Sequence, residues 1–259
     1  MSVLQLLGLA LGACFFISSV LIFSSWRRDN ATLRDFGADV LAGRKIDGAA
    51  VEKLMGKVYQ HEGFTKNDGY FLWRKLGATP VQILNKGGDC ADKSRLSAAI
   101  LGEYGIESTL VMLAPYAGGP FGHTVVEARA EDGPIVVDPV YDLTFPSTNG
   151  RFHDLRQLRG DPSILQSRLD ELIESRGEKD KIARYRRGED GAHYGYPKTI
   201  NLDKGPVIRI VKTVMGWFTD EPELIRRPRF LEDPKLFLTM VAAGLAACCF
   251  AVVGLPAIV

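Results

Sequence analysis

Two uncharged apolar runs, one near each end of the chain, constrain its architecture most strongly. Residues 3–23 and 236–259 carry no charged side chain. Each run reaches the roughly 20 residues that a helix needs to cross a hydrocarbon layer of about 30 Å. A soluble helix of this length would normally show a polar face. The sequence therefore predicts a two-pass membrane protein whose central segment is held at the membrane surface.

Basic residues flank both apolar runs on the side of the central segment. Arg27 and Arg28 follow the first run, and Arg226, Arg227 and Arg229 precede the second. Positively charged flanks favour the cytoplasmic side of a membrane. The flanks therefore predict a cytoplasmic central domain, although this rule is least informative for a long connecting segment.

A pair of small residues, Gly8 and Gly12, lies four positions apart in the first apolar run. Such pairs let two membrane helices approach closely. We expect this face to contact either the second membrane helix or a membrane-protein partner.

Composition narrows the possible functions of the central segment. The formal net charge is +1, and the basic runs are short and interrupted by acids, which gives no support for a nucleic-acid partner. Cys90 is the one cysteine outside the apolar runs, so no disulfide can form within the central segment. His153 and His193 have no cysteine or second histidine at metal-ligand spacing, so we expect no metal site.

Cys90 stands at the start of a predicted helix. Apolar residues recur three to four positions apart from Leu96 to Tyr104, and Gly105 supplies a stop. Asp89 suits the N-cap position. Cys90 then lies in the first turn, where unpaired N–H groups and the helix dipole favour a thiolate nucleophile.

A nucleophilic thiol needs a base, and His123 begins a β-branched run that predicts a strand. Asp138 ends the next apolar run and is the candidate group for orienting the imidazole. Strand parity places both side chains on one face. A turn at Glu131 and Asp132, or a bulge, would bring Asp138 opposite Val125, from where strand twist carries its carboxylate to the imidazole.

These segments resemble the transglutaminase-like superfamily of papain-fold enzymes. The resemblance rests on Gly-Asp-Cys-x-Asp-Lys at residues 88–93, Gly-His-x-x-x-Glu at 122–127 and Val-Asp-Pro at 137–139. It covers about residues 68–145. It implies an α+β fold in which a papain-like core packs a helix on an antiparallel sheet.

The resemblance also implies roles for individual residues. Cys90 would be the nucleophile, His123 the base and acid, and Asp138 the group that fixes the imidazole tautomer. Gln82 is a candidate side-chain donor to the oxyanion. Bacterial members often carry Trp where this chain has Val125, which weakens the substrate analogy. No cofactor is implied, and the chain lacks the acidic cluster of a calcium-dependent member.

The function implied is cysteine-dependent acyl transfer by a membrane-anchored enzyme, through amide hydrolysis or amine transfer from a Cys90 thioester. Its substrate would be a protein or peptide at the membrane. A bacterial member would lie in the cell inner membrane, and because many tethered relatives work outside that membrane, a periplasmic domain stays open. The alternatives are a non-catalytic membrane scaffold and an acetyltransferase with the same triad.

The predicted organisation has five parts. They are an anchor at 1–26, a helical linker at 27–64, the catalytic core at 65–150, an extension at 151–234 and a second membrane helix at 235–259. Within them we predict a helix at 70–76, a substrate-facing loop at 114–122 and a solvated segment at 176–190. An aromatic loop at 191–197 either lines the site or covers the core. An interfacial helix is predicted at 207–218.

Overall fold

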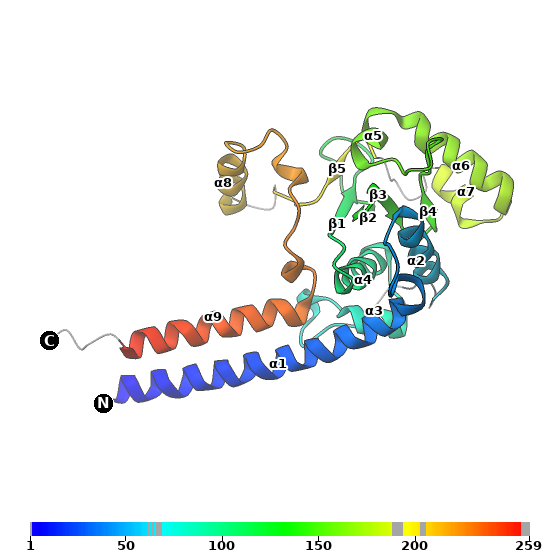
Figure 1. Ribbon diagram of the computed structural model, residues 1–259. Coiled ribbons are helices and arrows are strands. Elements are labelled where there is room, and N and C mark those ends of the chain that lie inside the picture. The colour runs from blue at the N-terminus through cyan, green and yellow to red at the C-terminus, as the bar shows by residue number, and fades with distance from the viewer. Residues whose placement is uncertain are drawn as a thin grey trace.

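The computed structural model describes residues 2–61, 63, 65, 69–187, 194–202 and 206–254. Figure 1 shows a core of helices and strands from which a helical hairpin projects. The elements are α1 (Val3–Leu41), α2 (Gly48–Gln60), η1 (Arg74–Leu76), α3 (Pro80–Lys86), α4 (Cys90–Glu103), β1 (Ser108–Leu113), β2 (His123–Ala130), β3 (Gly133–Asp138), β4 (Leu143–Thr144), α5 (Leu155–Gly160), α6 (Pro162–Arg176), α7 (Lys181–Arg186), β5 (Pro197–Lys198), α8 (Pro206–Met215), η2 (Pro222–Leu224), η3 (Arg229–Leu231) and α9 (Pro234–Gly254).

The strands form one antiparallel sheet in the order β4-β3-β2-β1-β5. Alternate residues of β2 point to opposite faces of this sheet. Val126 packs with buried residues of α1, α2 and α4, whereas Val125 packs with buried residues of α5, α6 and α7. The sheet is therefore covered by helices on both faces, and the predicted α+β class is confirmed.

The hairpin between β2 and β3 has the register that brings Asp138 toward His123. Ala130 pairs with Gly133, which leaves Glu131 and Asp132 as a two-residue turn, and Val126 pairs with Val137. Continuing this register places Asp138 opposite Val125. The predicted turn is confirmed.

The hairpin that projects from the core consists of α1 and α9, which lie side by side. Both helices are long and apolar enough to cross a membrane, with a mean hydropathy of 2.5 in their most apolar windows. The first anchor and the first linker helix are one continuous helix of 39 residues. These features support an association with membranes.

The Gly8 and Gly12 face of α1 contacts α9. A Cβ atom at Gly8 would meet the Val253 side chain, and one at Gly12 would meet the Phe250 ring. Small residues thus let the two helices approach closely. Of the two partners expected for this face, the structure shows the second apolar helix of the same chain.

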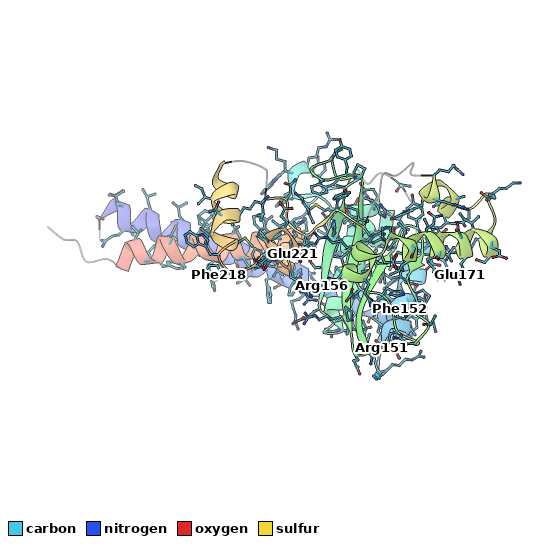
Figure 2. All side chains as sticks on the ribbon, turned by 90° about the horizontal axis from the view of Figure 1, so that it is seen from above. Arg151, Phe152, Arg156, Glu171, Phe218 and Glu221 are labelled. Atoms are coloured by element: carbon cyan, nitrogen blue, oxygen red, sulfur yellow. The ribbon has the colours of Figure 1, made fainter. Side chains whose placement is uncertain are left out.

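Polar contacts join α1 and α9 where the hairpin meets the core. The Trp26 indole N–H donates to the Asp233 carboxylate at 3.0 Å. Lys235 lies 2.6 Å from Asp29 and 2.9 Å from the Ser25 hydroxyl. Because Lys235 is nearly buried, its pairing offsets the cost of removing its charge from water. Viewed from above, the core extends away from this junction, with Glu171 of α6 at its far end (Figure 2).

The predicted helix at 70–76 is wrong in extent. Only the short 3-10 turn η1 forms there, and Phe71 and Gly77 close the loop through a backbone hydrogen bond of 2.9 Å. Leu72 adopts a positive φ of 63°, which is incompatible with a continuous right-handed helix. The loop leaves Leu72 and Trp73 exposed.

Candidate active site

Cys90 is the first residue of α4. The Asp89 carboxylate caps this helix, accepting the N–H groups of Ala91 at 3.0 Å and Asp92 at 3.1 Å. Among the described residues no partner is found for the Cys90 N–H. The Cys90 side chain is partly exposed. The predicted capped helix start is confirmed, and it presents a thiol and a free donor at the same place.

His123 begins β2 and Asp138 ends β3, and both side chains are buried. His123 Nε2 lies 2.5 Å from Asp138 Oδ2, and the other carboxylate oxygen accepts the Val140 N–H at 2.9 Å. His123 is 4% exposed and Asp138 is fully buried. Since Nε2 is bound to Asp138, Nδ1 is the ring nitrogen left for the contact of His123 with Cys90.

The charge state of His123 follows from these neighbours. Burial lowers the pKa of His123, but the charge and hydrogen bond of Asp138, together with the contact to Cys90, outweigh burial and raise it to about 10. His123 is therefore an imidazolium at neutral pH. A cation beside a cysteine at a helix N-terminus is the environment that makes a thiol reactive.

Two further residues of α4 fix it against its surroundings. The buried Ser94 hydroxyl donates to the Thr124 carbonyl at 2.9 Å, next to His123. Lys93 is also buried, and its ammonium lies 3.2 Å from the carbonyl oxygens of Val58 and Tyr59 at the end of α2. Sequence reasoning missed both roles, although a lysine on the first turn of a helix that faces the core was a possible signal.

Tyrosines enclose the imidazole. The Tyr141 and Tyr185 rings meet His123 edge to face, with centroids 5.6 and 5.8 Å away. Tyr185 belongs to α7 and is buried, so the prediction that residues 176–190 form a solvated segment is wrong for this part. Ile182 and Ala183 of α7 are buried in the same cluster, so three side chains pack this short helix on the core.

Tyr194 is a second buried tyrosine near the pair. Its ring packs edge to face on Phe145, with a centroid distance of 5.3 Å. Burial raises the pKa values of Tyr185 and Tyr194 well above 10, and the Asp138 charge acts in the same direction. Tyr194 belongs to the predicted aromatic loop, which it brings over the core near the site. Residues 191–193 of that loop, including His193, lie outside the described residues.

Gln82 is a capping residue of α3 rather than part of an extended lead into the nucleophile. Its side-chain oxygen accepts the Thr79 N–H at 2.9 Å, and its own N–H donates to the Thr79 hydroxyl at 3.2 Å. This reciprocal capping box fixes the side chain at the helix N-terminus. The capping contacts engage the side-chain oxygen and the backbone N–H of Gln82 but not its Nε2 amide group, so a role for Gln82 as an oxyanion donor stays a prediction.

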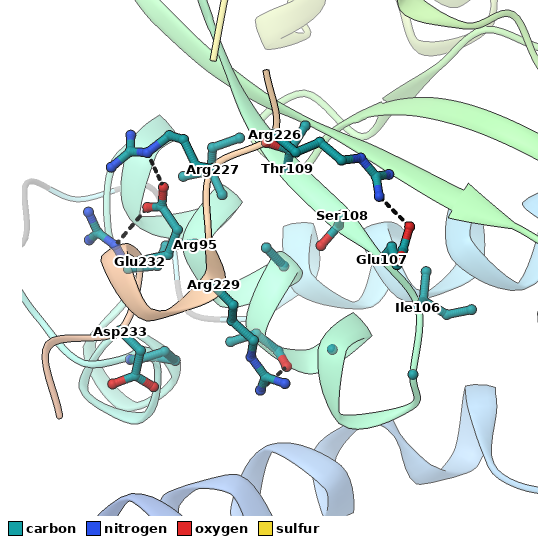
Figure 3. Close-up of a pocket in the computed structure, with 16 residues that line it drawn as sticks. Arg95, Ile106, Glu107, Ser108, Thr109, Arg226, Arg227, Arg229, Glu232 and Asp233 are labelled. Atoms are coloured by element: carbon teal, nitrogen blue, oxygen red, sulfur yellow. Dashed lines mark hydrogen bonds and ion pairs between the residues drawn. The ribbon is translucent and has the colours of Figure 1, made fainter. Parts of the chain in front are cut away.

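A cavity of about 320 Å³ lies elsewhere, between α4, β1 and the segment that leads into α9 (Figure 3). Neither Cys90, His123 nor Asp138 lines it. Its four arginines are Arg95, Arg226, Arg227 and Arg229, and each pairs with a carboxylate. Arg229–Glu103 ties the segment to the end of α4, and Arg226–Glu107 ties it to the residue before β1. We therefore interpret the cavity as a joint between core and membrane hairpin.

No group of three histidine, cysteine or acidic side chains is arranged to hold a metal ion within the described part of the chain. The described site thus contains a partly exposed thiol, a buried histidine and a buried carboxylate. Comparison with known proteins adds nothing to this geometry: no family model, no curated protein and no solved structure matches the chain.

Proposed function

We propose that the chain is a membrane-anchored, cysteine-dependent acyl-transfer enzyme with a papain-like core of the transglutaminase-like type. The observation that carries the proposal is the buried pair of His123 and Asp138, 2.5 Å apart, beside Cys90 at the start of α4. Burying a charged pair costs desolvation free energy, and strongly perturbed ionisable groups of this kind cluster at functional sites. Activation of Cys90 is the function that this pair serves here.

The first half-reaction forms a thioester. The Cys90 thiolate attacks the carbonyl carbon of an amide or ester, and the Cys90 N–H stabilises the oxyanion that develops. The Nδ1 proton of His123 passes to the leaving nitrogen or oxygen as its bond to the carbonyl carbon breaks. Asp138 holds the imidazole through Nε2 in both protonation states, so the ring is oriented throughout.

The second half-reaction releases the acyl group. Neutral His123 removes a proton from water or from an amine, which attacks the thioester carbonyl. The carbon–sulfur bond breaks, and the Cys90 thiolate and the His123 imidazolium are restored. Water gives hydrolysis, whereas an amine gives a new amide, and the same three residues serve both outcomes.

The two apolar helices support a reaction that takes place at a membrane surface. The basic flanks of the apolar runs favour a domain on the cytoplasmic face of an inner membrane, with the periplasmic face as the alternative. A core attached to the bilayer at two points acts most readily on a protein or peptide that is itself at the membrane. Such a substrate is part of the proposal.

The test is a burst experiment with 4-nitrophenyl acetate on the full chain in detergent. We expect a rapid release of nitrophenolate that approaches one equivalent per Cys90, followed by slower turnover as the thioester is hydrolysed. Cys90→Ala should abolish the burst. His123→Ala retains the thiol and should slow the burst by roughly 10²-fold or more, because general acid–base catalysis is lost.

A matched control is Cys14→Ala, since Cys14 is a free cysteine of the membrane hairpin remote from the core. It should leave the burst unchanged. A burst that survives Cys90→Ala would contradict the proposed nucleophile. Absence of any burst in the wild type would instead favour a non-catalytic scaffold.

A further inference from the structure

The helix α8 and the turn that follows it expose apolar side chains. Val214 lies four positions after Ile210 and three after Val211, so the three exposed side chains share one side of the helix. Trp217 and Phe218 follow in a turn and are 76% and 83% exposed. Exposed apolar groups gathered in this way mark a site of interaction.

The opposite side of α8 holds it to the core. Lys212 pairs with Glu223 of η2, and Glu223 also lies 2.7 Å from Lys198 of β5. The Glu223 carbonyl accepts the Thr199 hydroxyl at 2.9 Å. Lys212 is therefore directed to the protein, whereas Ile210, Val211 and Val214 on the other side of the helix are exposed.

The arrangement of α8 relative to the hairpin indicates what covers this surface. In Figure 1, α8 lies on the same side of the core as α1 and α9, and its axis runs across theirs. Figure 2 shows the same crossing from above, with Phe218 on the side of the hairpin. If α1 and α9 cross a bilayer, a helix in this orientation lies in the membrane plane.

A second group of exposed apolar side chains lies where the hairpin meets the core. Tyr70, Leu72 and Trp73 are exposed in the loop around η1. This loop lies beside the start of α9, where the Lys235 ammonium is 5.5 Å from the centre of the Phe71 ring. Amphipathic aromatic side chains prefer the boundary between hydrocarbon and water. Trp26, which bonds Asp233, is a further aromatic residue at the junction of α1 and α9.

We propose that α8 with Trp217 and Phe218 is an interfacial membrane helix, a third attachment of the chain to the bilayer besides α1 and α9. The occupant of its apolar side is the acyl-chain region of the lipid leaflet nearest the core. Three attachments that do not lie on one line fix how the core, and thus Cys90, is oriented toward the membrane. This inference is independent of the chemistry proposed for Cys90.

The test is fluorescence quenching in the full chain, reconstituted in phosphatidylcholine vesicles with plain or brominated acyl chains. The difference in emission between the wild type and Trp217→Tyr isolates Trp217 from Trp26 and Trp73. We expect this difference emission to be blue-shifted, and about half of it or more to be lost in brominated vesicles, because bromine quenches indoles that reach the acyl chains.

A double variant separates insertion of the helix from accidental contact. Ile210→Ser combined with Val214→Ser should remove most of the quenching of Trp217. Tyr116→Ser changes an exposed aromatic residue in another loop and should leave the quenching intact. Equal Trp217 emission in plain and brominated vesicles would overturn the proposal. In that case a water-like wavelength would mean a solvated helix, and a blue-shifted one a protein partner such as a second copy of the chain.

Discussion

Replacing Asp138 by alanine is expected to lower the pKa of His123 from about 10 to below its ordinary value of 6.5. Burial is the largest effect on this pKa and lowers it, and the charge and hydrogen bond of the carboxylate are the main effects that raise it. Without Asp138, burial would be opposed only by the weaker contact with Cys90. The imidazole would then be neutral at pH 7 and free to turn. The burst rate with 4-nitrophenyl acetate should fall by roughly 10²- to 10⁴-fold, the range associated with losing an oriented acid–base group.

The same substitution should change how stability depends on pH. In the wild type the pKa of His123 is raised above its unfolded value of 6.5. Its stabilisation is therefore fully present below pH 6.5 and is lost as the pH rises through about 10, at about 1.4 kcal/mol per pH unit. Denaturant titrations between these pH values should show this fall in the wild type but not in Asp138→Ala.

Asp138→Asn is the matched control for the role of the charge. Its side chain can still accept a hydrogen bond from Nε2, so it keeps the ring oriented but removes the negative charge. We expect its burst rate to lie between those of the wild type and Asp138→Ala. A pH-dependent stability that is identical in all three proteins would contradict the assignment of a charged His123–Asp138 pair.

Replacing Lys93 by methionine is expected to destabilise the core by about 2–4 kcal/mol. Methionine matches the length of the lysine stem but cannot donate to the carbonyl oxygens of Val58 and Tyr59, which would lose their partner at the end of α2. Because Lys93 is in the first turn of α4, the orientation of Cys90 should loosen as well. The free energy of unfolding from urea titrations measures the first effect.

Lys86→Met is the control for this substitution, because Lys86 is an exposed lysine in the last turn of α3. It should change the free energy of unfolding by less than about 0.5 kcal/mol. Equal stability of Lys93→Met and Lys86→Met would mean that the buried ammonium does not support the α2–α4 junction.

Local sequence signals were sufficient for the start of α4 and for the β2–β3 hairpin. Asp89 is a strong N-cap, and the Glu131–Asp132 turn followed from the geometry needed to bring Asp138 near the imidazole. The apolar runs likewise predicted the two long helices. The continuity of α1 past Arg27 and Arg28 was not predicted, because charged residues end a membrane span without ending a helix.

The residues that surround the site depend on contacts between distant parts of the chain. Tyr185 lies in a segment that is polar apart from a few residues, and its packing on His123, with the burial of Ile182 and Ala183, shows why α7 forms there. The capping role of Gln82 was not predicted because the helix that it caps is short. Such roles are set by tertiary packing, to which local periodicity is insensitive.

The measurement that tests the central claim most directly is the pH dependence of Cys90 alkylation by iodoacetamide, in the wild type and in His123→Ala. We predict that the wild-type thiol reacts rapidly at pH 5 to 6, where an ordinary thiol with a pKa of about 8.5 is almost fully protonated. His123→Ala should shift the reaction to the alkaline profile of an ordinary thiol. An ordinary profile in both proteins would contradict a Cys90 nucleophile activated by the His123–Asp138 pair.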